Sequence, residues 1–155
     1  MTQKKISNVL DRVNTQELQH LITVSTGFID AYIISCAEKE PMLLPQNVVL
    51  SALDSATQVS SVDWHEYSLP VFRVSDADRA LGVALVIEGD EVEQRFALMC
   101  NEMPESIRLR ISEVVDDERD VLDPTIMQYV RIGEALYHIP NLSQIQLSIG
   151  LSASN

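Results

Sequence analysis

The chain has 155 residues, of which 46% are hydrophobic and 22% are charged, as is usual for a folded soluble domain. Eleven basic residues against 23 acidic ones give a formal net charge of −12, a charge that repels phosphate backbones and anionic lipid surfaces. Apolar runs such as residues 83–87 are far too short to span a bilayer. We therefore expect neither nucleic acid nor membrane insertion.

The first part of the chain has the pattern of a helix rather than of a secretion signal. Residues 1–16 are polar and include an acid, without an apolar core or a cleavage pattern, so we expect a cytoplasmic location. Apolar residues recur there at helical spacing; they are Ile6, Val9, Leu10 and Val13. The sequence thus predicts an N-terminal helical extension over residues 1–25, before a domain at 26–152.

The next segments are strand-like. Residues 31–35 (AYIIS) and 42–45 (MLLP) flank the turn-forming stretch 38–41, which predicts a hairpin. Residues 47–53 fit either a strand or a short helix, and residues 54–63 read as a polar connection.

The second half continues with short strands. Residues 81–88 predict another strand, and residues 95–100 lead through a proline-containing loop into the next one. In the stretch 107–111, Ile, Leu and Ile alternate with two arginines, which predicts a strand with one buried and one solvated face.

The end of the chain combines an acidic stretch, two strands and a helix. The six acids of residues 113–124 predict a solvated loop, and residues 126–140 predict two strands around Gly133-Glu134. Asn141 then fits a helix N-cap. A stripe of Leu142, Ile145 and Ile149 with Gly150 at the end completes a short C-terminal helix.

Many short strands at about ten-residue spacing, with a helix at each end, predict a mainly β fold of barrels or a sandwich. Cys36 and Cys100 lie in apolar surroundings, so we expect both to be reduced and buried.

No catalytic or metal-binding motif stands out. The three histidines, His20, His65 and His138, are not spaced as a ligand pair. His65-Glu66 lacks the second histidine of a zinc-protease helix and reads as strand, with the two side chains on opposite faces. The acidic stretch lacks the glycine of a calcium loop. We therefore expect a protein without cofactor, metal or enzymatic activity.

The stretch VDWHEYSLPVFRVSD, residues 62–76, resembles a strand of the CheW-like adaptor domains. Residues 69–72 (LPVF) correspond to that family's Val-Pro-Val core, and Trp64 takes the preceding apolar place. Further segments match in order; they are residues 42–53, 77–111 and 135–145, so the resemblance covers about residues 30–150.

The resemblance implies a pair of five-stranded SH3-like β-barrels packed over a shared hydrophobic interface. It also implies a protein that acts without turnover and links the cytoplasmic tip of a methyl-accepting chemoreceptor to the regulatory domain of a CheA-type histidine kinase. The form IPNL at residues 139–142 is similar to CheW-like proteins of the chemosensory systems that govern type IV pili and twitching motility.

The candidate protein-binding residues come from this resemblance. The family's Arg-Gly pair, tied there to partner contacts, is replaced here by His65-Glu66, and its Val-x-Glu-Ile element aligns with Val49 and Ser51. Pro70 cannot donate to a ladder, so it belongs at a sheet edge or bulge, where a partner can pack. Pro70 could equally just bend the strand that closes the barrel.

One alternative to the coupling protein is a small acidic secretion chaperone, which binds a partner on an exposed apolar groove. A chaperone predicts a homodimer with about a third of its residues in helices, whereas the coupling protein predicts mainly strand. In the coupling protein, periodicity places Leu69 in a barrel core together with Tyr67 and Val71.

Overall fold

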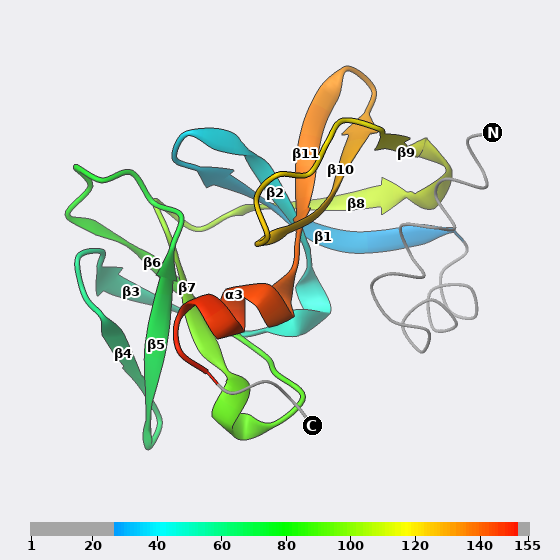
Figure 1. The fold of residues 1–155 in the computed structure, drawn as a ribbon. Helices are drawn as coiled ribbons and strands as arrows, with labels where there is room; N and C mark the ends of the chain where they lie inside the picture. The colour runs from blue at the N-terminus through cyan, green and yellow to red at the C-terminus, as the bar shows by residue number, and fades with distance from the viewer. Residues whose placement is uncertain (1–26, 152–155) are drawn as a thin grey trace.

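The computed structural model describes residues 27–151, and 56% of these residues lie in strands. They form two curled sheets and a C-terminal helix (Figure 1). The strands are β1 Phe28–Cys36, β2 Lys39–Pro45, β3 Val49–Ala56, β4 Ser61–Trp64, β5 Tyr67–Arg73, β6 Leu81–Ile87, β7 Phe96–Cys100, β8 Glu105–Arg110, β9 Val114–Asp117, β10 Ile126–Ile132 and β11 Ala135–Pro140. The helix is α3 Leu142–Ser148, and three single 3-10 turns are η1 Gln46–Val48, η2 Val92–Gln94 and η3 Ile111–Glu113. The predicted helix in residues 1–25 lies outside the described residues.

The middle of the chain builds one sheet and its two ends build the other. The five-stranded sheet has the order β3-β6-β7-β5-β4, and the six-stranded sheet has the order β8-β1-β2-β11-β10-β9. The chain thus leaves the six-stranded sheet after β2, completes the five-stranded sheet, and returns at β8. Two pairs are parallel, β2 with β11 and β5 with β7, and the remaining ladders are antiparallel.

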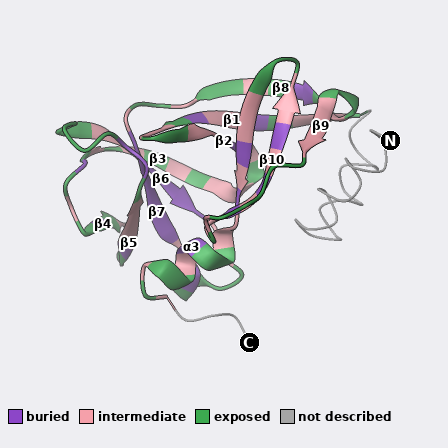
Figure 2. Ribbon diagram, turned by 45° about the horizontal axis from the view of Figure 1, so that its top comes forward, coloured by how far each residue is buried: buried purple, intermediate pink, exposed green. Residues whose placement is uncertain are grey.

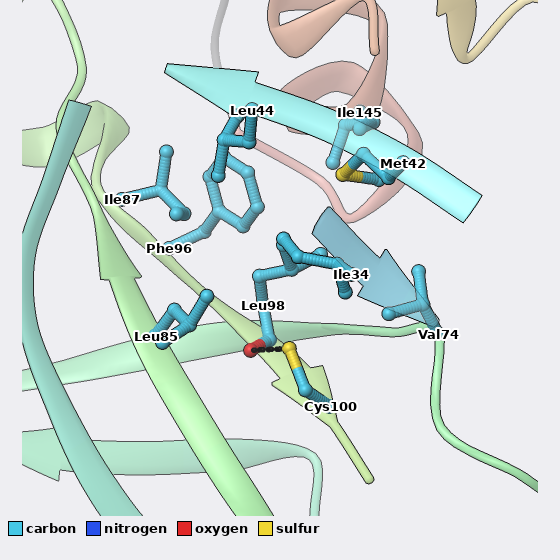
Figure 3. Packing of buried hydrophobic residues seen from close by; sticks show 10 residues of the cluster. All are labelled: Ile34, Met42, Leu44, Val74, Leu85, Ile87, Phe96, Leu98, Cys100 and Ile145. Carbon is cyan, nitrogen blue, oxygen red and sulfur yellow. Dashed lines mark hydrogen bonds between the residues drawn. The ribbon is translucent and has the colours of Figure 1, made fainter. Parts of the chain in front are cut away.

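A shared core joins the two sheets (Figure 3). It takes side chains from strands of both sheets and from α3. Its buried members are Ile34, Met42, Leu44, Val74, Leu85, Ile87, Phe96, Leu98, Cys100 and Ile145. Because this cluster contains one face of β1 and β2 and one face of β6 and β7, neither sheet can bury that face without the other.

The opposite face of each sheet curls around a cluster of its own. The five-strand core consists of Val62, Leu69, Ala84, Val86, Ala97 and Met99. The six-strand core consists of Ala31, Leu43, Leu109 and Val130. The two edge strands of the five-stranded sheet meet in one cluster, because Leu53 of β3 and Val62 of β4 both pack there.

Burial on both faces explains the continuous apolar runs of the sequence. All five residues of β7 are buried, with alternate side chains entering the shared core and the five-strand core. A strand covered on one face would alternate with polar residues instead. β8 has this second pattern, with Leu109 buried and Arg108 and Arg110 exposed, as its sequence predicts.

The C-terminal helix matches its sequence signals. The Asn141 side chain accepts a hydrogen bond from the backbone N–H of Gln144 at 3.2 Å, which is the predicted N-cap. Ile145 is 1% exposed and enters the shared core, while the outer side of the helix is exposed (Figure 2). Gly150 follows with φ +92°, a left-handed conformation that ends helices.

Both predicted hairpins form. β1 and β2 are joined by a turn at residues 37–38, tighter than the predicted stretch 38–41, since Cys36 pairs with Lys39. β10 and β11 are joined by Gly133-Glu134, where Gly133 has φ +63°. A glycine reaches this left-handed conformation without steric cost.

Two stretches predicted as loops contain strands. β3 continues to Ala56 and β4 begins at Ser61, within the expected connection 54–63; the open choice at 47–53 resolves as η1 followed by β3. Exposed and half-buried residues alternate along the edge strand β3, and none of them is fully buried. Polar residues therefore fit on either face of this strand and do not mark a loop.

The second such stretch holds β9, which gives the six-stranded sheet one strand more than the five expected. Asp117, at the end of β9, accepts hydrogen bonds from Arg131 Nε at 2.7 Å and Arg119 Nε at 2.9 Å. Because these arginines balance its charge, an acidic segment can pair with β10. None of the helices in residues 27–151 is long and apolar enough to cross a membrane.

Candidate protein-binding surface

The His65-Glu66 pair forms the turn of the β4–β5 hairpin. Trp64 pairs with Tyr67 across it, so the loop has two residues. His65 has φ 55°, in the left-handed region that histidine enters more readily than branched side chains do. The expectation that this pair lies in a strand, with side chains on opposite faces, is therefore wrong; both residues are exposed on a turn.

The hairpin extends beyond its neighbour β7. β5 pairs with β4 from Tyr67 to Pro70, and with β7 only from Val71 to Arg73. Pro70 lies where one ladder ends and the other begins, so its missing N–H is tolerated. The sequence predicted an edge or a bulge for Pro70, whereas β5 is an inner strand in the sheet order and pairs with β4 without a register shift.

The inner face of the hairpin runs past the end of the five-strand core. Leu69 is 3% exposed in that core, with Val71 packed against it, as predicted. Tyr67 precedes Leu69 by two residues on the same face, yet it is 45% exposed. The prediction that Tyr67 is buried is wrong, because the fully buried part of the core ends two cross-strand pairs away, at Val62 and Leu69.

Arg95 ties the turn to the β6–β7 connection, residues 88–95. The Arg95 guanidinium carbon lies 5.6 Å from the centroid of the Trp64 ring, and Arg95 Nε donates to Glu88 Oε1 at 2.9 Å. The rings of Trp64 and His65 meet edge-on with centroids 4.4 Å apart. These contacts hold Trp64 half-buried beside the exposed Tyr67.

The remaining candidate residues, Val49 and Ser51, lie on β3. Val49 packs against the shared core and pairs with Ile87, and Ser51 pairs with Val86 after an irregularity in the register. β3 and β4 are the two end strands in the order of the five-stranded sheet. The five candidate residues therefore form two groups, Val49 and Ser51 on the edge strand β3, and His65, Glu66 and Pro70 on the β4–β5 hairpin at the other side of the sheet.

The buried ionisable groups hold the fold together. His138 Nδ1 donates to the carbonyl of Glu40 at 2.8 Å, and burial lowers the pKa of His138. Burial raises the pKa of the Cys36 thiol to about 11 and that of the Cys100 thiol to about 12. Cys100 is buried and Cys36 is half-buried. Thiols held neutral in this way are weak nucleophiles.

Two carboxylates are held in ion pairs within the six-stranded sheet. A hydrogen bond from the Arg119 side chain is the main cause that lowers the pKa of Asp117 to about 2. The pKa of Asp123 is also lowered to about 2, mainly by the Lys39 ammonium, whose Nζ lies 2.8 Å from Asp123 Oδ2. Both carboxylates are charged near neutral pH, and both link segments that are distant in the sequence.

A small depression of about 140 Å³ lies on the described surface, and none of the candidate residues lines it. Its lining consists of Ile33, Ser35, Cys100, Asn101, Glu102, Met103, Pro104 and Glu105. Met103 is exposed there, whereas Met99 is fully buried in the five-strand core. Residues 27–151 contain no cluster of three or more His, Cys, Asp or Glu side chains that could hold a metal ion.

Sequence reasoning missed Arg95 and Glu88 as parts of the hairpin surface. They lie well apart from Trp64 in the sequence, and no spacing rule connects an arginine with an aromatic ring on another strand. The neighbouring acids of residues 88–93 were the only signal that this connection is exposed. Neither a protein-family profile nor a curated protein sequence matches this chain.

Proposed function

We propose that this chain is a non-catalytic, cytoplasmic coupling protein of the CheW-like type. Its partners are the regulatory domain of a CheA-type histidine kinase and the cytoplasmic tip of a methyl-accepting chemoreceptor, in a system that governs type IV pili. The observation that carries the proposal is the shared core, which joins two separately curled sheets and is closed by α3. The resemblance over residues 30–150 implies such a pair of small barrels over one interface.

We infer that the two curled sheets correspond to the two SH3-like barrels. Each sheet has a hydrophobic cluster of its own in addition to the shared core. The chain also crosses from one sheet to the other and back, so the two halves are intertwined and not sequential domains.

The roles of the perturbed ionisable groups support a protein that binds without turnover. Catalytic groups combine a shifted pKa with access to a substrate. Here His138 donates a hydrogen bond to a backbone carbonyl, Cys100 packs in the shared core, and Asp117 accepts hydrogen bonds from two arginines. Each shift is thus explained by a structural contact.

Secondary structure favours the coupling protein over a secretion chaperone. A chaperone should have about a third of its residues in helices, whereas α3, with 7 residues, is the one α-helix that residues 27–151 contain. A circular dichroism spectrum of the whole chain dominated by strand would extend this comparison to the complete molecule. Light scattering would test the homodimer that a chaperone predicts.

The direct test is calorimetric titration of the purified chain with the kinase regulatory domain and, separately, with the receptor tip. We expect dissociation constants in the micromolar range, about −8 kcal/mol in free energy, as for signalling contacts. Absence of binding to both partners at tens of micromolar, on the order of the weakest such contacts, would refute the proposal.

Variants of the turn test the assigned surface. We expect His65→Ala and Glu66→Ala to leave the fold intact, because both side chains are exposed, and to weaken partner binding. Glu134→Ala is a matched control, since Glu134 is also exposed in a two-residue turn, but on the six-stranded sheet. Equal binding by all three variants, or unfolding of both turn variants, would show that the turn is not the site.

A further inference from the structure

The end of the five-stranded sheet that carries the β4–β5 turn combines an exposed aromatic face with uncompensated acids. Figure 1 shows the β4–β5 turn and the β6–β7 connection at this same end of the sheet. Tyr67 is exposed beside Trp64, and Val92 of the connection is exposed too. We call residues 63–67 together with residues 88–95 the tip surface.

The apolar part of the tip surface is held in place before any partner arrives. Tyr67 stands opposite Trp64 in the ladder, and Trp64 is fixed by the five-strand core below it and by Arg95 beside it. Tyrosine presents a large apolar ring with few rotatable bonds, which suits it for partner contacts. The hairpin therefore offers a rigid anchor point beyond the end of its own core.

The charges around this anchor are almost all negative. Arg95 is the one lysine or arginine of the tip surface, and its side chain is 20% exposed and paired with Glu88. The acids of the tip surface are Asp63, Glu66, Glu88, Asp90, Glu91 and Glu93. Arg95 pairs with Glu88 and contacts Trp64, so the other five carboxylates have no ion pair with a lysine or arginine of residues 27–151. Their mutual repulsion falls when a cationic partner approaches.

We propose that the tip surface docks a basic segment of a partner protein, one in which lysines or arginines surround an apolar side chain. The apolar side chain packs against Tyr67, and the cations pair with Glu91 and Glu93. This inference rests on the proposed function only in taking the partner to be a protein. Phosphate-bearing partners are excluded at this surface by the sign of its charge.

Trp64 provides a reporter that needs no label, because it is the only tryptophan of the chain. The probe is a synthetic 16-residue peptide of leucine and lysine in an amphipathic pattern, and its control has glutamate in place of lysine. We expect the lysine peptide to change Trp64 emission saturably, with half-saturation at about 10–100 µM. The glutamate peptide should have no effect. Raising the salt concentration should weaken binding, since exposed charges are screened beyond about 8 Å at physiological ionic strength.

Charge-matched variants locate the binding. Glu91→Gln with Glu93→Gln removes two charges from the tip surface, and Glu38→Gln with Glu134→Gln removes two exposed charges from turns of the six-stranded sheet. We expect the first pair to weaken the lysine peptide about fivefold or more, by loss of direct charge pairs, and the second pair to leave it nearly unchanged. Tyr67→Ser should weaken it as well. Calorimetry with the same variants measures binding independently of Trp64.

Several results would overturn the inference. They are equal weakening by both charge-removing pairs, equal binding of both peptides, and binding heat without a response of Trp64. The kinase and receptor titrations separate this inference from the proposed function. If those partners bind normally while the lysine peptide does not bind, the tip surface is assigned wrongly and the coupling function stands. If the peptide binds at the tip while neither partner binds, the coupling function fails and the surface stands.

Discussion

Replacing Ile145 by alanine tests whether α3 holds the two sheets together. Ile145 is the one fully buried residue of α3, and it meets side chains of both sheets in the shared core. A helix of 7 residues is not stable by itself in water, so α3 depends on this contact. We expect Ile145→Ala to destabilise the whole domain and not only the helix.

The expected loss follows from the burial of the side chain. Ile145 is 1% exposed, and truncation to alanine removes three carbons, at about 0.8 kcal/mol each. The cavity left behind adds to this cost, so large-to-alanine changes in cores cost about 2–5 kcal/mol. Because single domains are stable by about 5–15 kcal/mol, the change removes a large part of the total.

Urea unfolding followed by Trp64 fluorescence measures this loss. Trp64 packs against the five-strand core and not against the shared core, so its signal moves only if the sheets unfold as one unit. With a slope of about 1–3 kcal/mol per molar urea, the midpoint should fall by roughly 1–2 M.

The matched control is Leu147→Ala on the same helix. Leu147 is 46% exposed, so its truncation should change stability by no more than about 0.5 kcal/mol. The same unfolding followed by circular dichroism separates two outcomes. Wild-type midpoints by both probes in Ile145→Ala would refute the role of Ile145. A lowered circular dichroism midpoint with an unchanged Trp64 midpoint would show that the sheets unfold independently.

Three further perturbations probe the fold. Leu69→Asp places a charge in the five-strand core and should prevent folding. The strand signal in circular dichroism would then be lost, and a native spectrum would show that Leu69 is not a core residue. Gly82→Ala would put a Cβ atom 2.2 Å from the carbonyl oxygen of Cys100. We expect the free energy of unfolding measured in urea to fall by about 1–3 kcal/mol, and an unchanged midpoint would contradict this close packing. Burial holds the pKa of His138 below its ordinary 6.5, so the unfolded chain binds a proton that the folded chain does not. The free energy of unfolding should therefore fall as the pH drops below 6.5, by at most about 1.4 kcal/mol per pH unit. His138→Gln should lose this part of the pH dependence, and an identical pH dependence in the variant would assign it to other groups.

Short-range sequence patterns predicted the structure correctly where a segment's conformation depends only on residues close to it in the sequence. The alternation in β8, the N-cap at Asn141 and the glycine turn of the β10–β11 hairpin were all predicted, because each depends on residues within a few positions of one another. The apolar run of β6 was also predicted as a strand, but not that both of its faces are covered. The acidic strand β9 was read as a loop, because its pairing with β10 and the ion pair of Asp117 with Arg131 join separate segments.

For the candidate surface, too, some features could be predicted from the sequence and others could not. The sequence placed Leu69 in a core, from the alternation of neighbouring residues, but it expected Pro70 at an edge or bulge, whereas Pro70 lies on the inner strand β5. It put His65-Glu66 in a strand instead of a turn, and it buried Tyr67, because periodicity does not tell where a core ends. Arg95 was not foreseen beside Trp64, since this contact joins separate strands.

Composition and short-range pattern by themselves determined a mainly β, strongly acidic chain of short strands with a capped C-terminal helix. Tertiary structure decided which faces meet in the shared core, which strand ends project into solvent, and which acids are left without a cation. The physical reason is that backbone conformation and amphipathic period are set within a few residues. Burial and charge balance, by contrast, depend on side chains that the fold brings together from distant parts of the chain.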